Sequence, residues 1–129
     1  MMNAAAIWVA PTMCRRILAI DDDLETTAAL KRLLEAHGYS VREENNPMTA
    51  LATARAFQPH VIILDYAMPK AHGGDVAWQI ASDRSLRDTK LIICSGVGFE
   101  EFRLRLPPVR IAVLEKPVKP DALLDLLRH

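Results

Sequence analysis

The residues Val61-Ile62-Ile63-Leu64-Asp65-Tyr66-Ala67-Met68-Pro69 decide the fold of this chain. Four consecutive apolar residues lead directly into a carboxylate, and Pro69 and then Gly73-Gly74 mark a turn after it. An apolar run of this kind predicts a parallel strand that is covered on both faces. Asp65 then stands at the carboxyl end of the strand, where open α/β sheets place their ligand sites, although an aspartate there can also simply cap a turn.

Four other stretches have the composition of strands, and helical segments alternate with them. This alternation predicts a parallel sheet with helices on both faces. We therefore predict an α/β fold, a flavodoxin-like doubly wound five-stranded parallel sheet of (βα)5 form, with the second strand near an edge. Helix 4 is expected to be short or irregular because Pro107-Pro108 ends it. The other strands are predicted at 17–20, 39–42, 91–94 and 111–114, and the helices at 24–37, 47–57 (capped by Asn46), 75–85, 99–106 and from 120 onward.

The composition of the 129-residue chain is that of one ordinary globular domain. Sixteen basic residues balance sixteen acidic ones, so no net charge favours nucleic acid or a membrane surface as a partner. The apolar stretch 4–10 is far shorter than the roughly 20 residues of a membrane span, and it lacks the flanks of a signal peptide. Cys14 and Cys94 fit no metal or redox spacing and are typical of a reducing compartment, so we expect a cytoplasmic protein.

Residues 1–13 do not share the periodic pattern of the rest of the chain. Either Met13 is a true start and the preceding residues are an upstream extension, or Ile7, Trp8 and Val9 dock on this domain or on a partner. We therefore separate an N-terminal extension, 1–13, from a single domain, 14–129.

Four of the five predicted strands end in a polar or ionisable side chain. The first strand leads into Asp21 and Asp22, the third into Asp65, the fourth into Ser95 and the fifth into Lys116. Each has an ordinary structural explanation, as a helix cap, a turn residue or a surface lysine. Because right-handed crossovers place the carboxyl ends of all parallel strands on one edge, however, these residues should meet there.

Their chemistry together is more specific than that of each alone. Three carboxylates in one cleft repel one another, so some must bind protons or a cation must join them. Hard oxygen ligands, few in number and partly solvated, suit Mg²⁺. A carboxylate beside Mg²⁺ can attack phosphorus and form an aspartyl-phosphate. Lys116 and the metal would then neutralise the phosphoryl oxygens, and Ser95 would donate a hydrogen bond to one of them.

In order and spacing, these motifs resemble the receiver domain of two-component response regulators across residues 14–129. The resemblance implies that Asp65 is the phospho-acceptor and a Mg²⁺ ligand. It further implies that Asp22 binds Mg²⁺ directly, that Asp21 acts through water and that the backbone carbonyl of Ala67 is another ligand. The motifs are Ile20-Asp21-Asp22-Asp23, Leu64-Asp65-Tyr66-Ala67-Met68-Pro69, Cys94-Ser95-Gly96 and Glu115-Lys116-Pro117.

The resemblance gives the remaining motif residues a part in switching. Ser95 would follow the phosphoryl group, Gly96 would leave room for it, and Lys116 would bind it directly before a cis Lys116-Pro117 bond. The expected function is that of a phospho-accepting signalling switch of a phosphorelay, which catalyses only its own phosphorylation and dephosphorylation. The implied partners are a histidine kinase or histidine phosphotransfer protein, an unknown downstream protein and, in one arrangement, a second copy of the chain.

Two other functions are weighed against this one. A Mg²⁺-dependent phosphohydrolase with an aspartate nucleophile would need a second acid or base near Asp65, and the position two residues later is Ala67. An interaction module without phosphorylation would not need the acidic pair, Ser95 and Lys116. No output domain is expected after His129, so we expect a stand-alone receiver or a piece cut from a larger regulator or hybrid kinase.

The sequence departs from the family in its readout. Family members carry an aromatic residue on the fifth strand whose rotation follows the switch, and Val113 occupies that position here. We therefore predict that the signal is read through the loop 96–98 and the segment after it.

Overall fold

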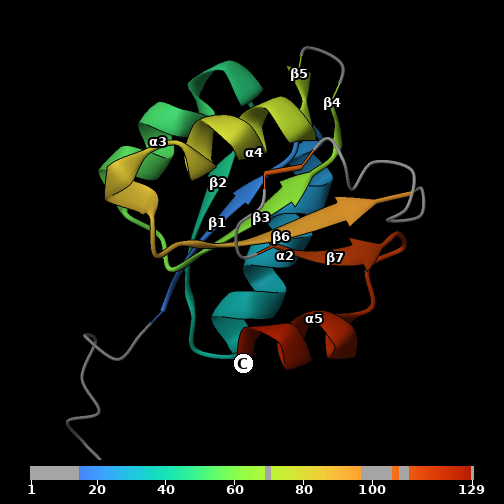
Figure 1. Ribbon diagram of the computed structural model, residues 1–129. Coiled ribbons are helices and arrows are strands. Elements are labelled where there is room, and N and C mark those ends of the chain that lie inside the picture. The colour runs from blue at the N-terminus through green and yellow to red at the C-terminus, as the bar shows by residue number, and fades with distance from the viewer. Residues whose placement is uncertain (1–14, 69–70, 97–105, 108–110, 129) are drawn as a thin grey trace, which may run out of the picture.

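The computed structural model describes residues 15–68, 71–96, 106–107 and 111–128, and the helices and strands within them are labelled in Figure 1. The strands are β1 (Arg16–Ile20), β2 (Ser40–Glu44), β3 (Val61–Asp65), β4 (Ala67–Met68), β5 (Ala71–His72), β6 (Lys90–Ser95) and β7 (Ile111–Glu115). The helices are α2 (Leu24–Ala36), α3 (Ala50–Phe57), α4 (Gly73–Ala81) and α5 (Pro120–Arg128), and 3-10 turns cover η2 (Pro47–Thr49) and η3 (Arg84–Leu86).

Five of the strands form one parallel sheet in the order β2-β1-β3-β6-β7. This confirms the predicted doubly wound sheet, and it places β2 at an edge as expected. The strand β3, which ends at Asp65, lies at the centre between β1 and β6, and all five of its residues are buried. Asp65 is paired with Cys94 and Ser95 with Glu115, so the carboxyl ends of β3, β6 and β7 lie level with one another.

Helices cover both faces of the sheet, which explains why its central strands are apolar without interruption. Figure 1 shows α3 and α4 on one face and α2 and α5 on the other. Alternate residues of one strand point to opposite faces. In β3, Ile62 and Leu64 belong to the core under α3 and α4, whereas Val61 and Ile63 belong to the core under α2 and α5.

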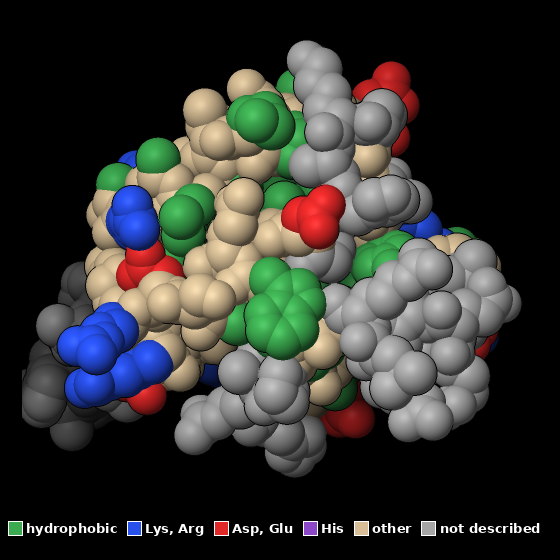
Figure 2. All heavy atoms as spheres, turned by 45° about the horizontal axis from the view of Figure 1, so that its top comes forward, with side chains coloured by type: hydrophobic (Ala, Val, Ile, Leu, Met, Phe, Trp, Pro, Cys, Tyr) green, Lys and Arg blue, Asp and Glu red, His purple; other side chains and the backbone are tan. Residues whose placement is uncertain are grey.

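The surface over α3 and α4 carries exposed apolar side chains, including Met48 and Trp78. Figure 2 turns this side toward the viewer and shows the hydrophobic side chains as separate patches between polar and charged ones. Isolated exposed apolar side chains are normal on a globular protein, so these two residues do not by themselves indicate a binding surface.

Two of the predicted helices begin or end differently in the structure. The helix predicted at 75–85 was wrong at both ends, because α4 starts at Gly73 and stops at Ala81. Asp83 explains the early end, since its side chain accepts the Ser85 N–H and caps the separate turn η3. In the helix predicted at 47–57, Asn46 caps the first turn as expected, but that turn is the 3-10 turn η2.

The short pair β4 and β5 was not predicted. These two strands form an antiparallel hairpin that begins two residues after Asp65, with Ala67 opposite His72. Two residues of strand between a turn signal and a helix are too few to produce a pattern in the sequence. The helix predicted at 99–106 lies outside the described residues except for Leu106, which is buried. Within the described part of the chain, no helix is both long and apolar enough to span a bilayer.

Candidate functional site

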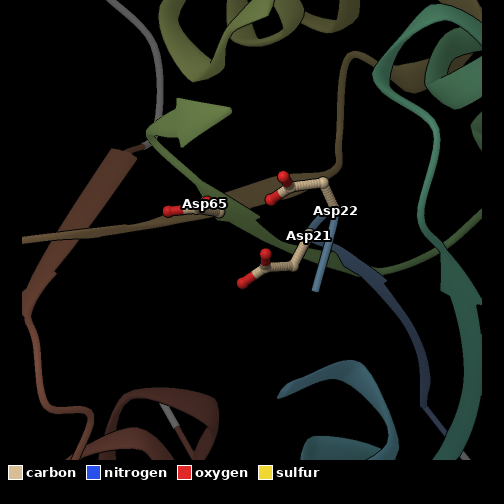
Figure 3. A group of neighbouring side chains, drawn as sticks. All are labelled: Asp21, Asp22 and Asp65. Carbon is tan, nitrogen blue, oxygen red and sulfur yellow. The ribbon is translucent and has the colours of Figure 1, made fainter. Parts of the chain in front are cut away.

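Three carboxylates meet at the carboxyl edge of the sheet. Asp21 and Asp22 follow β1, and Asp65 ends the neighbouring strand β3 (Figure 3). Each of the three offers an oxygen within 4.8 Å of the others. Asp21 and Asp65 are 7% and 5% exposed, whereas Asp22 is exposed. The predicted acidic cluster is therefore present, with two buried members and one that faces solvent.

The three consecutive aspartates after β1 divide two tasks between them. Asp23 caps α2, because its side chain accepts the Glu25 N–H at 3.1 Å and the Thr26 hydroxyl at 2.8 Å. The helix-capping explanation thus applies to Asp23. Asp21 is turned to the site, and its Oδ1 accepts the Asp23 N–H at 3.0 Å.

Lys116 reaches the cluster from the end of β7. Its Nζ donates a hydrogen bond to Asp65 Oδ1 at 2.5 Å, although the lysine side chain is 39% exposed. The backbone supports this position, since the Lys116 N–H donates to the Ser95 carbonyl at 2.8 Å. The Lys116-Pro117 peptide bond is cis, as predicted. An ion pair with a buried carboxylate is more than an ordinary surface lysine would make.

Ser95 ends β6 at the same edge and is only 3% exposed. A Cβ atom added to the next residue, Gly96, would meet nothing within 4 Å, so there is open space beside it. Ala67 lies two positions after Asp65, in β4. Asp21, Asp22, Asp65, Ser95 and Lys116 are therefore at or just beyond the carboxyl ends of β1, β3, β6 and β7, and Ala67 follows in β4.

Sequence reasoning missed one residue that holds Asp21 in place. The Asn45 side-chain amide donates to the Asp21 carbonyl at 2.8 Å and to the Thr27 hydroxyl at 2.8 Å. Asn45 follows β2 directly, so β2, like the other four strands of the sheet, leads into a polar residue. The predicted second strand ended at Arg42, so Asn45 was not recognised as a residue at the end of a strand.

The electrostatics of the cluster favour a bound cation. Burial raises the pKa of Asp21 to about 6, and the charge of Asp65 adds to this, although the Asp23 N–H acts in the opposite direction. Burial alone would lower the pKa of Lys116, but the hydrogen bond and charge of Asp65 outweigh it and raise that pKa. Among the described residues, the ion pair of Lys116 with Asp65 thus offsets only part of the negative charge of the three carboxylates.

The donor set fits Mg²⁺. Two buried carboxylates and one exposed carboxylate supply hard oxygen atoms within a single ion's reach, and the exposed side of Asp22 leaves room for the waters that Mg²⁺ retains. The neighbouring Cys94 is buried, and burial raises its pKa to about 11, so it contributes no thiolate.

Comparison with known proteins gives a consistent result. The family model described as "Response regulator receiver domain" matches residues 17–128. Among curated proteins, the chain is 39% identical over 67 residues to "Response regulator MprA" of Mycobacterium leprae. The matched region covers 52% of this chain and 29% of that protein. It is 31% identical over 114 residues to the "Phosphoglycerate transport system transcriptional regulatory protein PgtA" of Salmonella typhimurium, covering 86% of this chain and 26% of that protein.

Solved structures resemble the chain over most of its length. A response regulator signal receiver domain from Bermanella marisrubri is 30% identical with a TM-score of 0.76, over 89% of this chain and 96% of that one. A CheY-like response regulator receiver domain protein from Methanospirillum hungatei JF-1 is 25% identical with a TM-score of 0.81, over 89% and 91% of the two chains. The chain spans less than a third of the length of the two curated relatives.

Proposed function

The chain belongs to the family of response regulator receiver domains, and we propose that it is a phospho-accepting switch in which Asp65 receives the phosphoryl group. The observation that carries the proposal is the ion pair between Lys116 Nζ and buried Asp65 inside the acidic cluster. Burying an ionised carboxylate costs free energy unless the charge is paired. Here Lys116 pairs with Asp65, and the carboxylates of Asp21 and Asp22 lie close enough to share a cation with it.

The proposed step is a phosphoryl transfer. A carboxylate oxygen of Asp65 attacks phosphorus, a new P–O bond forms, and the bond from phosphorus to the donor breaks, so that the donor leaves with that electron pair. Lys116 is close enough to neutralise charge on the phosphoryl oxygens, and the Ser95 hydroxyl is the group that would move toward them. Asp21, Asp22, Asp65 and the Ala67 carbonyl would hold Mg²⁺, which supplies further charge neutralisation.

The proposal extends to the partners. A histidine kinase or histidine phosphotransfer protein in the cytoplasm would supply the phosphoryl group, and an unknown protein, or a second copy of the chain, would respond to it. Catalysis would be limited to the chain's own phosphorylation and dephosphorylation. The curated relatives are longer regulators, of which this chain matches less than a third. The downstream response to phosphorylation of this domain is therefore also a proposal. No contact in the described residues supports the alternative phosphohydrolase.

Readout through the loop 96–98 is likewise proposed. Val113 is half-buried, lies opposite Ile93 and packs on the core under α3 and α4, where a valine has no large rotation to offer. Residues 97–105 lie outside the described residues, so the proposal rests on Val113 and on the space beside Gly96.

Intact mass measurement tests the proposed function. The chain is incubated with acetyl phosphate and Mg²⁺, and we expect the wild type to gain one phosphoryl mass that Asp65→Asn does not gain. The control variant is Asp88→Asn, which changes an exposed aspartate in the turn before β6 and should be labelled like the wild type. Equal labelling of wild type and Asp65→Asn would remove Asp65 from its role. Repeated turnover of acetyl phosphate without a lasting adduct would favour the hydrolase.

A further inference from the structure

A groove runs along the seam between α2 and the connection from β7 to α5. Ala29, Leu30 and Leu33 line it from α2, and Pro117 and Val118 line it from the connection. Lys116, which pairs with Asp65 of the acidic cluster, also lines it. Its volume is about 480 Å³. Leu30, Leu33 and Val118 are only partly buried although they pack on the core, so they keep apolar surface toward the groove. An apolar groove of this size on a small domain is suited to apolar side chains.

The chain enters the fold at the other end of the same seam. The Arg15 guanidinium donates to the Leu127 carbonyl of α5 at 2.6 Å, and the Arg15 carbonyl accepts the N–H of Ser40, just beyond α2, at 2.9 Å. Arg15 therefore lies between the ends of α2 and α5. The described part of the chain therefore begins next to the seam.

The preceding sequence has the chemistry of the groove. Residues 4–10 read Ala-Ala-Ala-Ile-Trp-Val-Ala and carry no charged side chain. Residues 10 to 7 lie five to eight positions before Arg15, so an extended chain carries them about 17 to 26 Å from it. The height of the sheet along β1, from Arg16 to Ile20, is about 13 Å. The apolar residues can thus reach the groove along its whole length.

We propose that residues 4–10 of this chain pack in the groove between α2 and the β7–α5 connection. The apolar side chains Ile7, Trp8 and Val9 would cover Leu30, Leu33 and Val118 and remove their remaining apolar surface from water. Of the other exposed large apolar side chains, Met48 and Trp78 belong to η2 and α4, and α3 and α4 cover the opposite face of the sheet (Figure 1). Leu24 begins α2.

The proposal gives the segment a position beside the functional site. Lys116 lines the groove and also pairs with Asp65. A segment held there would border the lysine without entering the acidic cluster. This placement does not depend on the proposed phosphorylation, because it follows from the groove, the reach of the chain and the composition of residues 4–10.

Tryptophan fluorescence tests the placement in the full chain. The sequence has two tryptophans, and Trp78→Phe leaves Trp8 as the single reporter. We expect acrylamide to quench Trp8 about threefold less in the Trp78→Phe chain than in the same chain with Ala29→Glu added. The reason is that an unpaired charge in the groove would expel the apolar segment. Ala29 is exposed, so this change leaves the core intact. The matched control is Ala52→Glu, an exposed alanine of α3 on the opposite face, which should leave the quenching unchanged.

Three results would overturn the proposal. Trp8 could be strongly quenched in both the Trp78→Phe parent and its Ala29→Glu variant, or it could be protected equally in both. Its protection could also disappear on dilution, which would assign the groove to a second copy of the chain. A second readout covers a loss of folding in the Ala29 variant. In the Trp78→Phe chain, Trp8→Ala should shift the methyl resonances of Val118, and unchanged resonances would contradict the placement.

Discussion

Charged side chains are arranged differently at the two ends of the strands of the central sheet, which we call the carboxyl edge and the amino edge. At the carboxyl edge, Asp21, Asp22 and Asp65 each offer an oxygen within 4.8 Å of the others, and Lys116 forms an ion pair with Asp65. At the amino edge, cationic side chains bind main-chain carbonyl groups. Arg16 Nε donates to the Gln58 carbonyl at 2.9 Å, and Lys90 Nζ donates to the Leu126 carbonyl at 2.9 Å.

The difference separates residues that hold the fold from residues that we propose to bind a ligand. Cations at the amino edge satisfy carbonyl groups at the ends of α3 and α5, and these bonds stabilise the domain as it stands. The acidic residues at the carboxyl edge repel one another, and a cation that completes the charge balance would relieve this. Sites built for a ligand commonly reduce stability in its absence.

Asp21→Asn should show the largest effect and should act in two directions. Because burial raises the pKa of Asp21 from 3.8 to about 6, the folded state binds this proton more tightly than the unfolded state, and metal-free stability falls as the pH rises from about 4 to about 6. At pH 7 the variant should therefore be more stable than the wild type by about 2 kcal/mol. Mg²⁺ affinity should fall by at least about tenfold. Urea unfolding with and without Mg²⁺ measures both changes.

The control for Asp21→Asn is Asp88→Asn, which removes an exposed carboxylate far from the cluster. It should change neither stability nor Mg²⁺ binding. If Asp21→Asn lowers the metal-free stability at pH 7, the charge of Asp21 does not destabilise the metal-free domain, and the comparison of the two edges fails.

Arg16→Met should produce the opposite result at the amino edge. The Arg16 guanidinium donates through Nε to the Phe57 carbonyl at 3.2 Å and through Nη2 to the Gln58 carbonyl at 2.7 Å, where Gln58 ends α3 with a φ of 53°. Methionine keeps most of the apolar stem but none of these bonds, so we expect a loss of roughly 1 to 2 kcal/mol. Mg²⁺ affinity should be unchanged.

Arg32→Met is the matched control, because Arg32 is an exposed arginine on α2. Urea unfolding should show a loss well below that of Arg16→Met. A reduction in Mg²⁺ affinity by Arg16→Met would show that the two edges are coupled rather than separate.

The carboxyl edge could be predicted from the sequence because each of its residues follows an apolar strand. The run 61–64 identified β3 without ambiguity, and the alternation of strands with helices then fixed which ends share an edge. Asp21, Asp65, Ser95 and Lys116 are therefore found by position alone. The division of tasks between Asp21 and Asp23 required coordinates, since an aspartate at either position can cap a helix.

The amino edge and the turns could not be predicted in the same way. Arg16 and Lys90 bind carbonyl groups of distant segments, and a hydrogen bond to a main-chain atom leaves no pattern in the sequence. The early end of α4 depends on the side chain of Asp83, which competes with the helix for Ser85. Such contacts are decided by tertiary geometry rather than by local propensity.

His60 gives the smallest expected effect and tests the sign of the comparison. Its Nδ1 accepts the Arg16 N–H at 2.8 Å at the amino edge. Burial lowers the pKa of His60 below 6.5, and the charges of Arg16 and Arg15 lower it further. The unfolded state therefore binds this proton more tightly, so the contribution of His60 to stability is present above pH 6.5 and is lost as the pH falls.

The pH dependence of the two edges should thus have opposite signs. In urea unfolding between pH 5 and 7, His60→Asn keeps an acceptor for the Arg16 N–H but cannot be protonated, so it should remove a contribution that rises with pH. Asp21→Asn should remove one that falls with pH. Ala52→Asn, at an exposed alanine of α3 that carries no titratable group, is the control and should follow the pH dependence of the wild type. If His60→Asn also follows the wild type, the amino edge is insensitive to pH in this range, and the contrast between the edges rests on the carboxylates alone.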